Sequence, residues 1–85
     1  MNWELRVRKH IKKTLSHFPK KVQRQIVLVL RELIQSPYSE DIVKIAGEEN
    51  IWRRRVGSYR IFYEIFPKDR MIYVFRIERR TSKTY

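Results

Sequence analysis

The chain has 85 residues, and 20 lysine and arginine residues against 9 aspartate and glutamate residues give it a formal net charge of +11. A chain of this length buries roughly 60 to 65% of its unfolded surface, so one layer of helices on one sheet is about the largest core that it can form. It contains no cysteine, which excludes disulfides and thiolate metal sites, and so large an excess of positive charge predicts a large anionic partner.

Apolar runs are short throughout the sequence. None approaches the roughly 18 residues of a membrane span, and the N-terminus lacks the apolar segment of a signal peptide. We therefore expect a soluble, cytoplasmic protein that does not bind a membrane.

The N-terminal part of the chain changes from a strand pattern to a helix pattern. Apolar and charged residues alternate over residues 3–7, which predicts a strand, and apolar residues then follow helical spacing as far as residue 18. Pro19 is expected to end this first helix and to open a second one over residues 20–35. The second helix carries an apolar stripe formed by Val22, Ile26, Val29, Leu30 and Leu33.

The C-terminal half predicts three strands. Residues 36–50 have a mixed composition and predict a loop, and strand patterns then cover residues 51–56, 59–66 and 71–79. The expected order is β-α-α-β-β-β. This order predicts an α+β fold in which two N-terminal helices pack on one face of a small, mainly antiparallel twisted sheet.

Strand alternation assigns the side chains of these three strands to two faces. The face toward the helices is expected to carry Trp52, Val56, Tyr59, Ile61, Tyr63, Ile65, Tyr73, Phe75 and Ile77. The opposite face is expected to carry Arg53, Arg55, Arg60, Phe62, Val74 and Arg76. Arg54 alone has core-side parity, so either its charged end reaches past the edge of the helices or the assignment for this strand is wrong.

The arginines of the opposite face suit a polyanion. Guanidinium groups match phosphate oxygens, stay ionised and stack on bases, and Phe62 and Tyr85 offer further rings for stacking. Charged edge strands also discourage aggregation. Four arginines on one inferred face of so basic a chain nevertheless favour nucleic-acid contact.

Three segments resemble the RelE branch of the RelE/ParE toxin superfamily: FPKKVQRQIVLVLREL, WRRRVGSYRIFYEI and YVFRIERRTSKTY. The most specific part is the run of arginine, valine, glycine, any residue, tyrosine and arginine that ends at Arg60. The resemblance covers nearly the whole chain. It implies one RelE-like toxin domain over residues 1–85, belonging to a type II toxin–antitoxin pair, with a cognate acidic antitoxin that folds on the toxin.

The resemblance also implies an activity. RelE-like toxins cleave mRNA, usually on the ribosome, by attack of a 2′-hydroxyl on the adjacent phosphate, and they need no metal or cofactor. By their positions in the motifs, Arg60, Arg79 and Tyr85 match catalytic residues of the family. The arginines expected to bind RNA are Arg53, Arg55, Arg76 and Arg80.

Some positions depart from the family pattern. Well-known RelE enzymes carry two lysines where this chain has Ile51 and Arg53, and arginine is a poor proton donor or acceptor because it stays protonated. Glu78 stands where many relatives have a histidine, and it can act as a general base or pair with Arg79 and Arg80. Two other functions therefore stay open: a ParE-like toxin that binds a protein target such as DNA gyrase, and a plain RNA-binding module.

Overall fold

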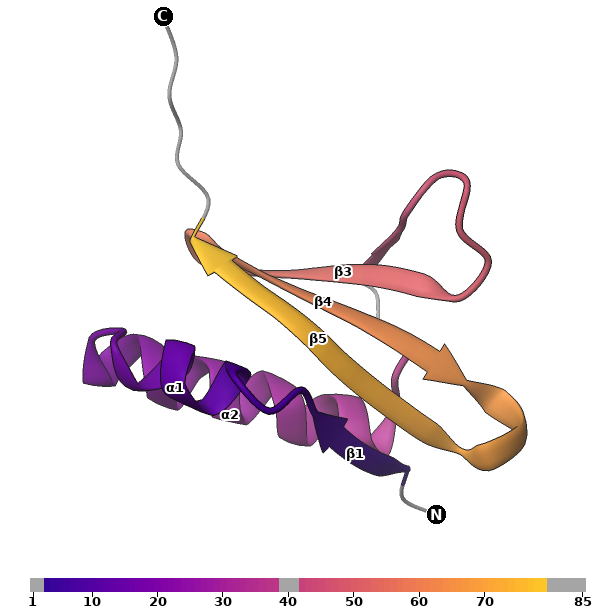
Figure 1. Cartoon of the computed structure of the whole chain (residues 1–85), viewed down its shortest axis with the longest axis horizontal. Helices are drawn as coiled ribbons and strands as arrows, with labels where there is room; N and C mark the ends of the chain where they lie inside the picture. The colour runs from indigo at the N-terminus through magenta and orange to yellow at the C-terminus, as the bar shows by residue number, and fades with distance from the viewer. Residues whose placement is uncertain (1–2, 39–41, 80–85) are drawn as a thin grey trace, which may run out of the picture.

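Two helices cover one face of a five-stranded sheet within the part of the chain that the structure describes, residues 3–38 and 42–79 (Figure 1). The structure is a computed structural model. It confirms the expected α+β fold and the mainly antiparallel sheet. The elements are β1 (Glu4–Val7), α1 (Ile11–Ser16), α2 (Lys20–Gln35), β2 (Ile42–Lys44), β3 (Ile51–Val56), β4 (Tyr59–Phe66), the 3-10 helix η1 (Pro67–Asp69) and β5 (Met71–Arg79).

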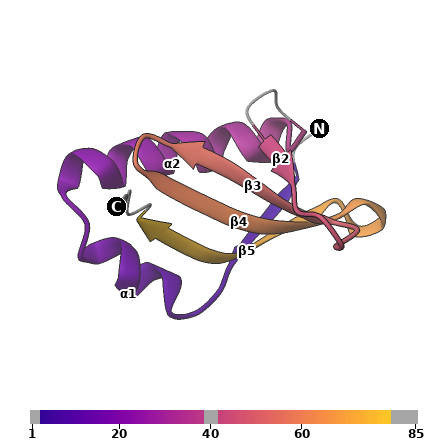
Figure 2. The same cartoon turned by 90° about the horizontal axis from the view of Figure 1, so that it is seen from above.

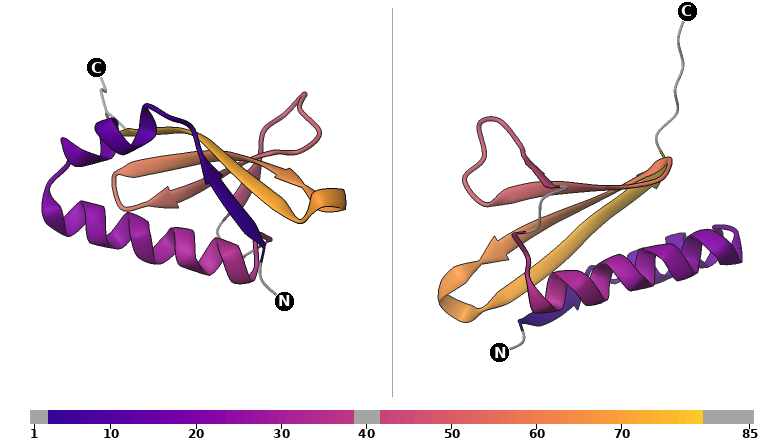
Figure 3. Two further views of the ribbon diagram at one scale, coloured as in Figure 1. Left: turned by 60° about the horizontal axis from the view of Figure 1, so that its bottom comes forward. Right: turned by 180° about the vertical axis from the view of Figure 1, so that it is seen from behind.

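The strand order across the sheet is β1-β5-β4-β3-β2 (Figure 2). Strand β1 runs parallel to β5, and the other neighbours are antiparallel. The two longest strands, β4 and β5, therefore occupy the middle of the sheet, with β1 and β2 at its edges. Both helices lie on the same side, and none of the described helices covers the other side of β3, β4 and β5 (Figure 3). We call this uncovered side the outer face.

Helix α2 forms because its apolar residues recur at helical spacing, and the stripe packs against the sheet. Ile26, Val29 and Leu33 are its buried residues. Pro19 stands immediately before the first helical residue, where a missing backbone N–H costs nothing because that N–H would have no partner inside the helix. The predicted range of residues 20–35 is confirmed.

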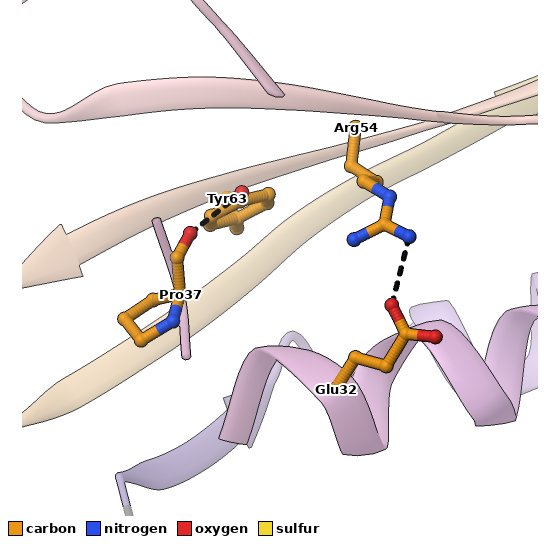
Figure 4. Close-up of polar contacts among 4 residues, drawn as sticks. All are labelled: Glu32, Pro37, Arg54 and Tyr63. Atoms are coloured by element: carbon orange, nitrogen blue, oxygen red, sulfur yellow. Dashed lines mark hydrogen bonds and ion pairs between the residues drawn. The ribbon is translucent and has the colours of Figure 1, made fainter. Parts of the chain in front are cut away.

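The core lies between α2 and the middle strands. Ile61, Tyr63 and Ile65 of β4 have no exposed surface, as the alternation predicted. The Tyr63 hydroxyl donates a hydrogen bond to the Pro37 carbonyl oxygen at 3.3 Å (Figure 4). Burial raises the pKa of Tyr63 well above its usual range, so the phenol stays protonated and keeps donating this bond.

Two expectations for the elements are wrong in detail. The segment expected to form a loop contains β2, a three-residue strand that pairs with β3 at the edge of the sheet. Three residues are too few to show an alternating pattern, so the strand depends on its partner rather than on its own sequence. Helix α1 is also short and ends at Ser16, two residues before Phe18.

The face assignment for β5 is wrong over half of the strand. Ile72 and Val74 are buried in the core, whereas Tyr73 and Phe75 are only half-buried. The cause is a shift of register: Phe62 pairs with Arg76 and Tyr63 pairs with Val74, which leaves Phe75 without a cross-strand partner. An extra residue of this kind is a β-bulge, and it reverses the alternation along one strand.

The turn between β3 and β4 sets the register of the outer face. Gly57 and Ser58 form a two-residue loop, and Gly57 has a φ of 58°. L-residues with a side chain rarely adopt this left-handed conformation, at a cost of about 1–2 kcal/mol. The turn thus places Arg55 directly opposite Arg60.

We expect Gly57→Ala to lower the free energy of unfolding by about 1–2 kcal/mol, because alanine must adopt the same positive φ. No heavy atom lies within 4 Å of the added methyl group, so the effect comes from the backbone alone. Ser58→Ala is the matched control and should change stability by less than about 0.5 kcal/mol. Urea unfolding of the two variants measures both values, and equal stabilities would contradict the turn assignment.

Candidate nucleic-acid interface

Four arginines lie on the outer face of β3, β4 and β5. In β3 and β4, Arg55 pairs with Arg60 and Arg53 pairs with Phe62, which in turn pairs with Arg76 of β5. Neighbours directly across two strands project from the same face. The structure therefore brings together the four arginines that the alternation placed on this face.

The pair Arg55 and Arg60 is electrostatically unfavourable by itself. Cβ atoms directly opposite each other in an antiparallel pair are about 4.5–5.5 Å apart, and like charges at that spacing are destabilising. The Nε atom of Arg60 is also shielded from solvent and has no hydrogen-bond partner within the described residues. Such an arrangement is relieved when an anion binds between the two guanidinium groups.

Glu78 connects two of the arginines. Its Oε1 atom lies 2.7 Å from Nη2 of Arg76, and its Oε2 atom lies 3.9 Å from Nε of Arg60. Its side chain is 29% exposed. The expected pairing of Glu78 with arginines is thus seen, but with Arg60 and Arg76 on the outer face. The carboxylate stands directly beside the arginine that the motif singled out.

A hollow of about 350 Å³ lies at the β3 edge of this face. It is lined by Val43, Arg53, Arg55 and Gly57. Because two guanidinium groups and no carboxylate line it among the described residues, it suits an anionic group. Strand β2, which the sequence pattern did not show, contributes the Val43 wall.

Arg54 is on the helix side of β3, as its parity indicated, and the face assignment for this strand was therefore right. It pairs with Ile61 across the strands and is only 8% exposed. Its Nη2 atom lies 2.9 Å from Oε1 of Glu32, which α2 presents from below the sheet (Figure 4). The charged end thus pairs with a carboxylate of α2 whose side chain is itself 60% exposed, and Arg54 is not part of the outer face.

The remaining predicted catalytic and RNA-binding residues either lie away from the outer-face arginines or fall outside the described residues. Arg79 is the last residue of β5, is exposed, and pairs with Tyr59, whose side chain belongs to the core side. The structure therefore does not place Arg79 on the same face as Arg60. Arg80 and Tyr85 lie outside the described residues. Ile51, where the resemblance implies a lysine, does lie on the outer face, opposite Glu64.

Sequence reasoning missed two aromatic residues of the outer face, Tyr73 and Phe75. Their rings approach each other with a centroid distance of 6.5 Å, and the ring of Phe75 lies 6.4 Å from that of Phe62. Period-two alternation assigned both to the core. The signal that would have placed them correctly is the bulge, which depends on pairing with β4 and leaves no mark in the β5 sequence itself.

The described residues contain no group of three histidine, aspartate or glutamate side chains arranged to hold a metal ion. No helix in residues 3–38 or 42–79 is long and apolar enough to cross a membrane. The outer face of β3, β4 and β5 carries guanidinium groups, aromatic rings and the carboxylates of Glu64 and Glu78.

Comparison with known proteins gives the family. Residues 2–83 match the model of the ParE toxin of type II toxin–antitoxin systems. The putative toxin RelE1 of Methanocaldococcus jannaschii is 25% identical over 83 residues, covering 94% of this chain and 92% of the relative.

Solved structures agree with this result. The archaeal RelE–RelB complex from Pyrococcus horikoshii has a chain with a TM-score of 0.87 and 25% identity, over 98% of this chain and 100% of that one. The RelB–RelE complex from Methanococcus jannaschii gives a TM-score of 0.73 and 32% identity, over 88% and 90% of the two chains. This chain belongs to the ParE toxin family, and thus to the RelE/ParE superfamily of toxins of type II toxin–antitoxin systems.

Proposed function

We propose that this toxin inhibits translation by cleaving mRNA, on the ribosome, at the outer face of the sheet. The observation that carries the proposal is the set of four arginines on that face, with Arg55 and Arg60 directly opposite each other. Such a face binds the phosphates of a single strand. The likeness to RelE chains supports the choice of mRNA over other nucleic acids.

The chemical step is a transfer within the RNA itself and consumes no other reactant. The 2′-oxygen of a nucleotide attacks the adjacent phosphorus, the bond from phosphorus to the 5′-oxygen breaks, and the products are a 2′,3′-cyclic phosphate and a 5′-hydroxyl. Negative charge accumulates on the phosphoryl oxygens in the transition state, and fixed cations stabilise it. We assign this role to Arg60 with Arg53 and Arg55, and keep Arg79 and Tyr85 as predicted contributors, Tyr85 as the acid for the 5′-oxygen.

We assign the removal of the 2′ proton to Glu78. A guanidinium group is a poor base, and Glu78 is the carboxylate that the structure places within ion-pair distance of Arg60. Because Arg76 and Arg60 hold it, it is oriented toward the phosphate-binding arginines. An ionised Glu78 also repels a bound phosphate. Its two roles are therefore opposed: Glu78 should promote cleavage while it weakens RNA binding.

Glu78→Gln separates these roles. If Glu78 is the base, the variant should lose cleavage by about 100-fold or more while binding RNA at least as tightly as the parent chain. Single-turnover cleavage and binding of an uncleavable RNA, measured on the same preparation, give both numbers. Full cleavage by the variant would leave Glu78 with the ion-pair role alone.

The partner that this proposal requires is an acidic antitoxin. The matched chains in the Pyrococcus and Methanococcus structures are crystallised with RelB. A carboxylate-rich segment that folds on this toxin can neutralise the arginines that otherwise hold RNA. The two ligands should therefore compete, and a stable complex containing toxin, antitoxin and RNA together would refute the competition.

A purified translation reaction tests the proposed function. The protein is added to a reaction that translates a reporter mRNA, and primer extension maps new 5′ ends in the message. Cleavage confined to translated message supports the proposal, and cleavage of free RNA at the same rate would remove the ribosome from it. An intact message would refute the nuclease.

A second function is favoured by the family model itself, which is the one for ParE toxins. A toxin of that kind binds a protein target such as DNA gyrase without cleaving RNA. Supercoiling of relaxed plasmid by gyrase, with the protein added, tests it directly. Inhibited supercoiling together with an intact message would establish the second function instead of the first.

A further inference from the structure

Three neighbouring aromatic rings lie on the outer face, one from β4 and two from β5. We call Phe62, Phe75 and Tyr73 the aromatic row. Neighbouring ring centroids in the row are 6.4 and 6.5 Å apart, and the planes are inclined by 43° and 32°. All three side chains are half-buried, so part of each ring is open to a ligand on the outer face.

The bulge in β5 makes the row possible. Because Phe75 has no cross-strand partner, the chain places Phe75 and Arg76 in succession on the outer face, between the buried residues Val74 and Ile77. Regular alternation would have turned Phe75 toward the core. Bulges re-aim side chains and occur frequently beside functional sites.

Stabilisation of the fold by ring packing does not by itself explain why the aromatic row is there. The protein stabilises another aromatic group differently: Tyr38 packs against Trp3 and Trp52 with planes inclined by 83° in both pairs, the edge-to-face geometry of structural ring clusters. The aromatic row is less steeply inclined and lies among charged residues. Its apolar surface is therefore placed where a charged ligand is expected.

The row begins inside the arginine cluster. Phe62 pairs with Arg53 on one side and Arg76 on the other, and the guanidinium carbon of Arg76 lies 5.6 Å from the centre of the Phe62 ring. Every nucleotide of a strand carries both a phosphate and a base, so a surface that binds the strand needs both cations and exposed rings. Cations beside a ring can bind the phosphate while the ring contacts the base.

We propose that the aromatic row is a base-stacking subsite for single-stranded RNA, which takes nucleotides flanking the phosphate held by the arginines. The proposal deepens the function above and rests on RNA being the ligand of the outer face. Stacking on phenylalanine and tyrosine tolerates every base, because each base has a flat face. The subsite therefore adds affinity and fixes the position of the strand without selecting a sequence.

Two oligonucleotides with equal charge test the subsite. One is a fluorescently labelled 2′-O-methyl RNA hexamer, which cannot be cleaved by 2′-hydroxyl attack, and the other has the same backbone with the bases removed from its central positions. Phe75→Leu keeps an apolar side chain but removes the ring, Phe75→Tyr keeps the ring, and Leu28→Ala on α2 is a surface control, since Leu28 is 58% exposed. Thermal unfolding of each variant verifies that it folds.

We expect Phe75→Leu to weaken binding of the complete hexamer by about 5- to 100-fold. Its binding to the abasic hexamer should stay within twofold of the parent chain, and Phe75→Tyr and Leu28→Ala should bind both hexamers normally. Equal losses for the two hexamers, or no loss for either, would overturn the subsite. Selective loss of affinity for the antitoxin, with the hexamers bound normally, would also overturn it.

The stacking subsite and the nuclease activity can be tested separately. The hexamer experiment measures binding alone and does not depend on cleavage. An inactive protein that binds the complete hexamer through Phe75 would refute the nuclease and support the subsite. A protein that cleaves mRNA equally well with Phe75→Leu, and binds the hexamer equally well, would refute the subsite and leave the nuclease intact.

Discussion

Arg60→Ala is expected to abolish mRNA cleavage, with a loss of about 100-fold or more, while the protein folds normally. Removing one fixed donor from a charge-stabilising site costs about 10²–10³ in rate. Arg60 lies on the outer face, opposite Arg55 and away from the core between the sheet and the helices, with 27% of its side chain exposed. Loss of the repulsion from Arg55 offsets loss of the 3.9 Å contact with Glu78, so the stability should change little.

The control for this variant is Arg24→Ala, which removes an exposed arginine from α2 on the other side of the sheet. It lowers the net charge by the same amount, so it should keep nearly full cleavage if the position of the charge matters. Arg60→Lys should recover only part of the rate, since an ammonium group cannot hold two phosphate oxygens as a fork. Retained cleavage in a folded Arg60→Ala protein would remove Arg60 from the site.

The second large effect concerns the three consecutive arginines of β3. Arg54 lies on the helix side of the strand, whereas Arg53 and Arg55 lie on the outer face. Arg54→Ala should lower the free energy of unfolding by about 2–3 kcal/mol, because it leaves a cavity under the sheet and removes the contact with Glu32. Little of this comes from the charge pair itself, since the Glu32 side chain is 60% exposed and well solvated. RNA binding by the folded variant should be normal.

Arg53→Ala and Arg55→Ala are the matched neighbours, and they should behave in the opposite way. Both residues line the hollow on the outer face, so each variant should keep its stability and lose RNA affinity, with a lower salt dependence of binding. Urea unfolding and binding of the 2′-O-methyl hexamer at several salt concentrations measure both properties for all three variants. Equal destabilisation by the three substitutions would contradict the division of β3 into two faces.

Two elements of the fold are specified by their own local sequence and were predicted correctly for that reason. Helix α2 is long and strongly amphipathic, and Pro19 marks its start, so periodicity and this proline together predict its bounds. The hairpin of β3 and β4 is specified locally by Gly57, whose positive φ suits a two-residue turn. Once that turn is placed, alternation correctly separates Arg53 and Arg55 from Arg54.

The failures come from features that depend on contacts between distant segments. Strand β2 exists because it pairs with β3, and the bulge at Phe75 exists because β5 pairs with β4. Neither leaves a periodic pattern in its own segment. The partner of Arg54 could not be foreseen either, because Glu32 lies 22 positions away on a helix whose rotation over the sheet is set by packing.

The candidate site was predicted in part for the same reasons. The four outer arginines follow from alternation in β3 and β4 and from the position of Arg76 beyond the bulge, where Arg76 again lies outward. Arg79 is one residue beyond Glu78, so it has the opposite parity and pairs with Tyr59. Its predicted catalytic role therefore needs the end of β5 to rearrange when RNA binds, and the motif match alone carried that assignment.

The chemical nature of the cut ends tests the central claim most directly, namely that the outer face cleaves mRNA by 2′-hydroxyl attack. Message recovered from a translation reaction containing the purified protein is examined for its new termini. Our account predicts a 2′,3′-cyclic phosphate on the upstream fragment and a 5′-hydroxyl on the downstream fragment, with neither formed by Arg60→Ala. Fragments ending in a 3′-hydroxyl and a 5′-phosphate, or a message left whole, would contradict it.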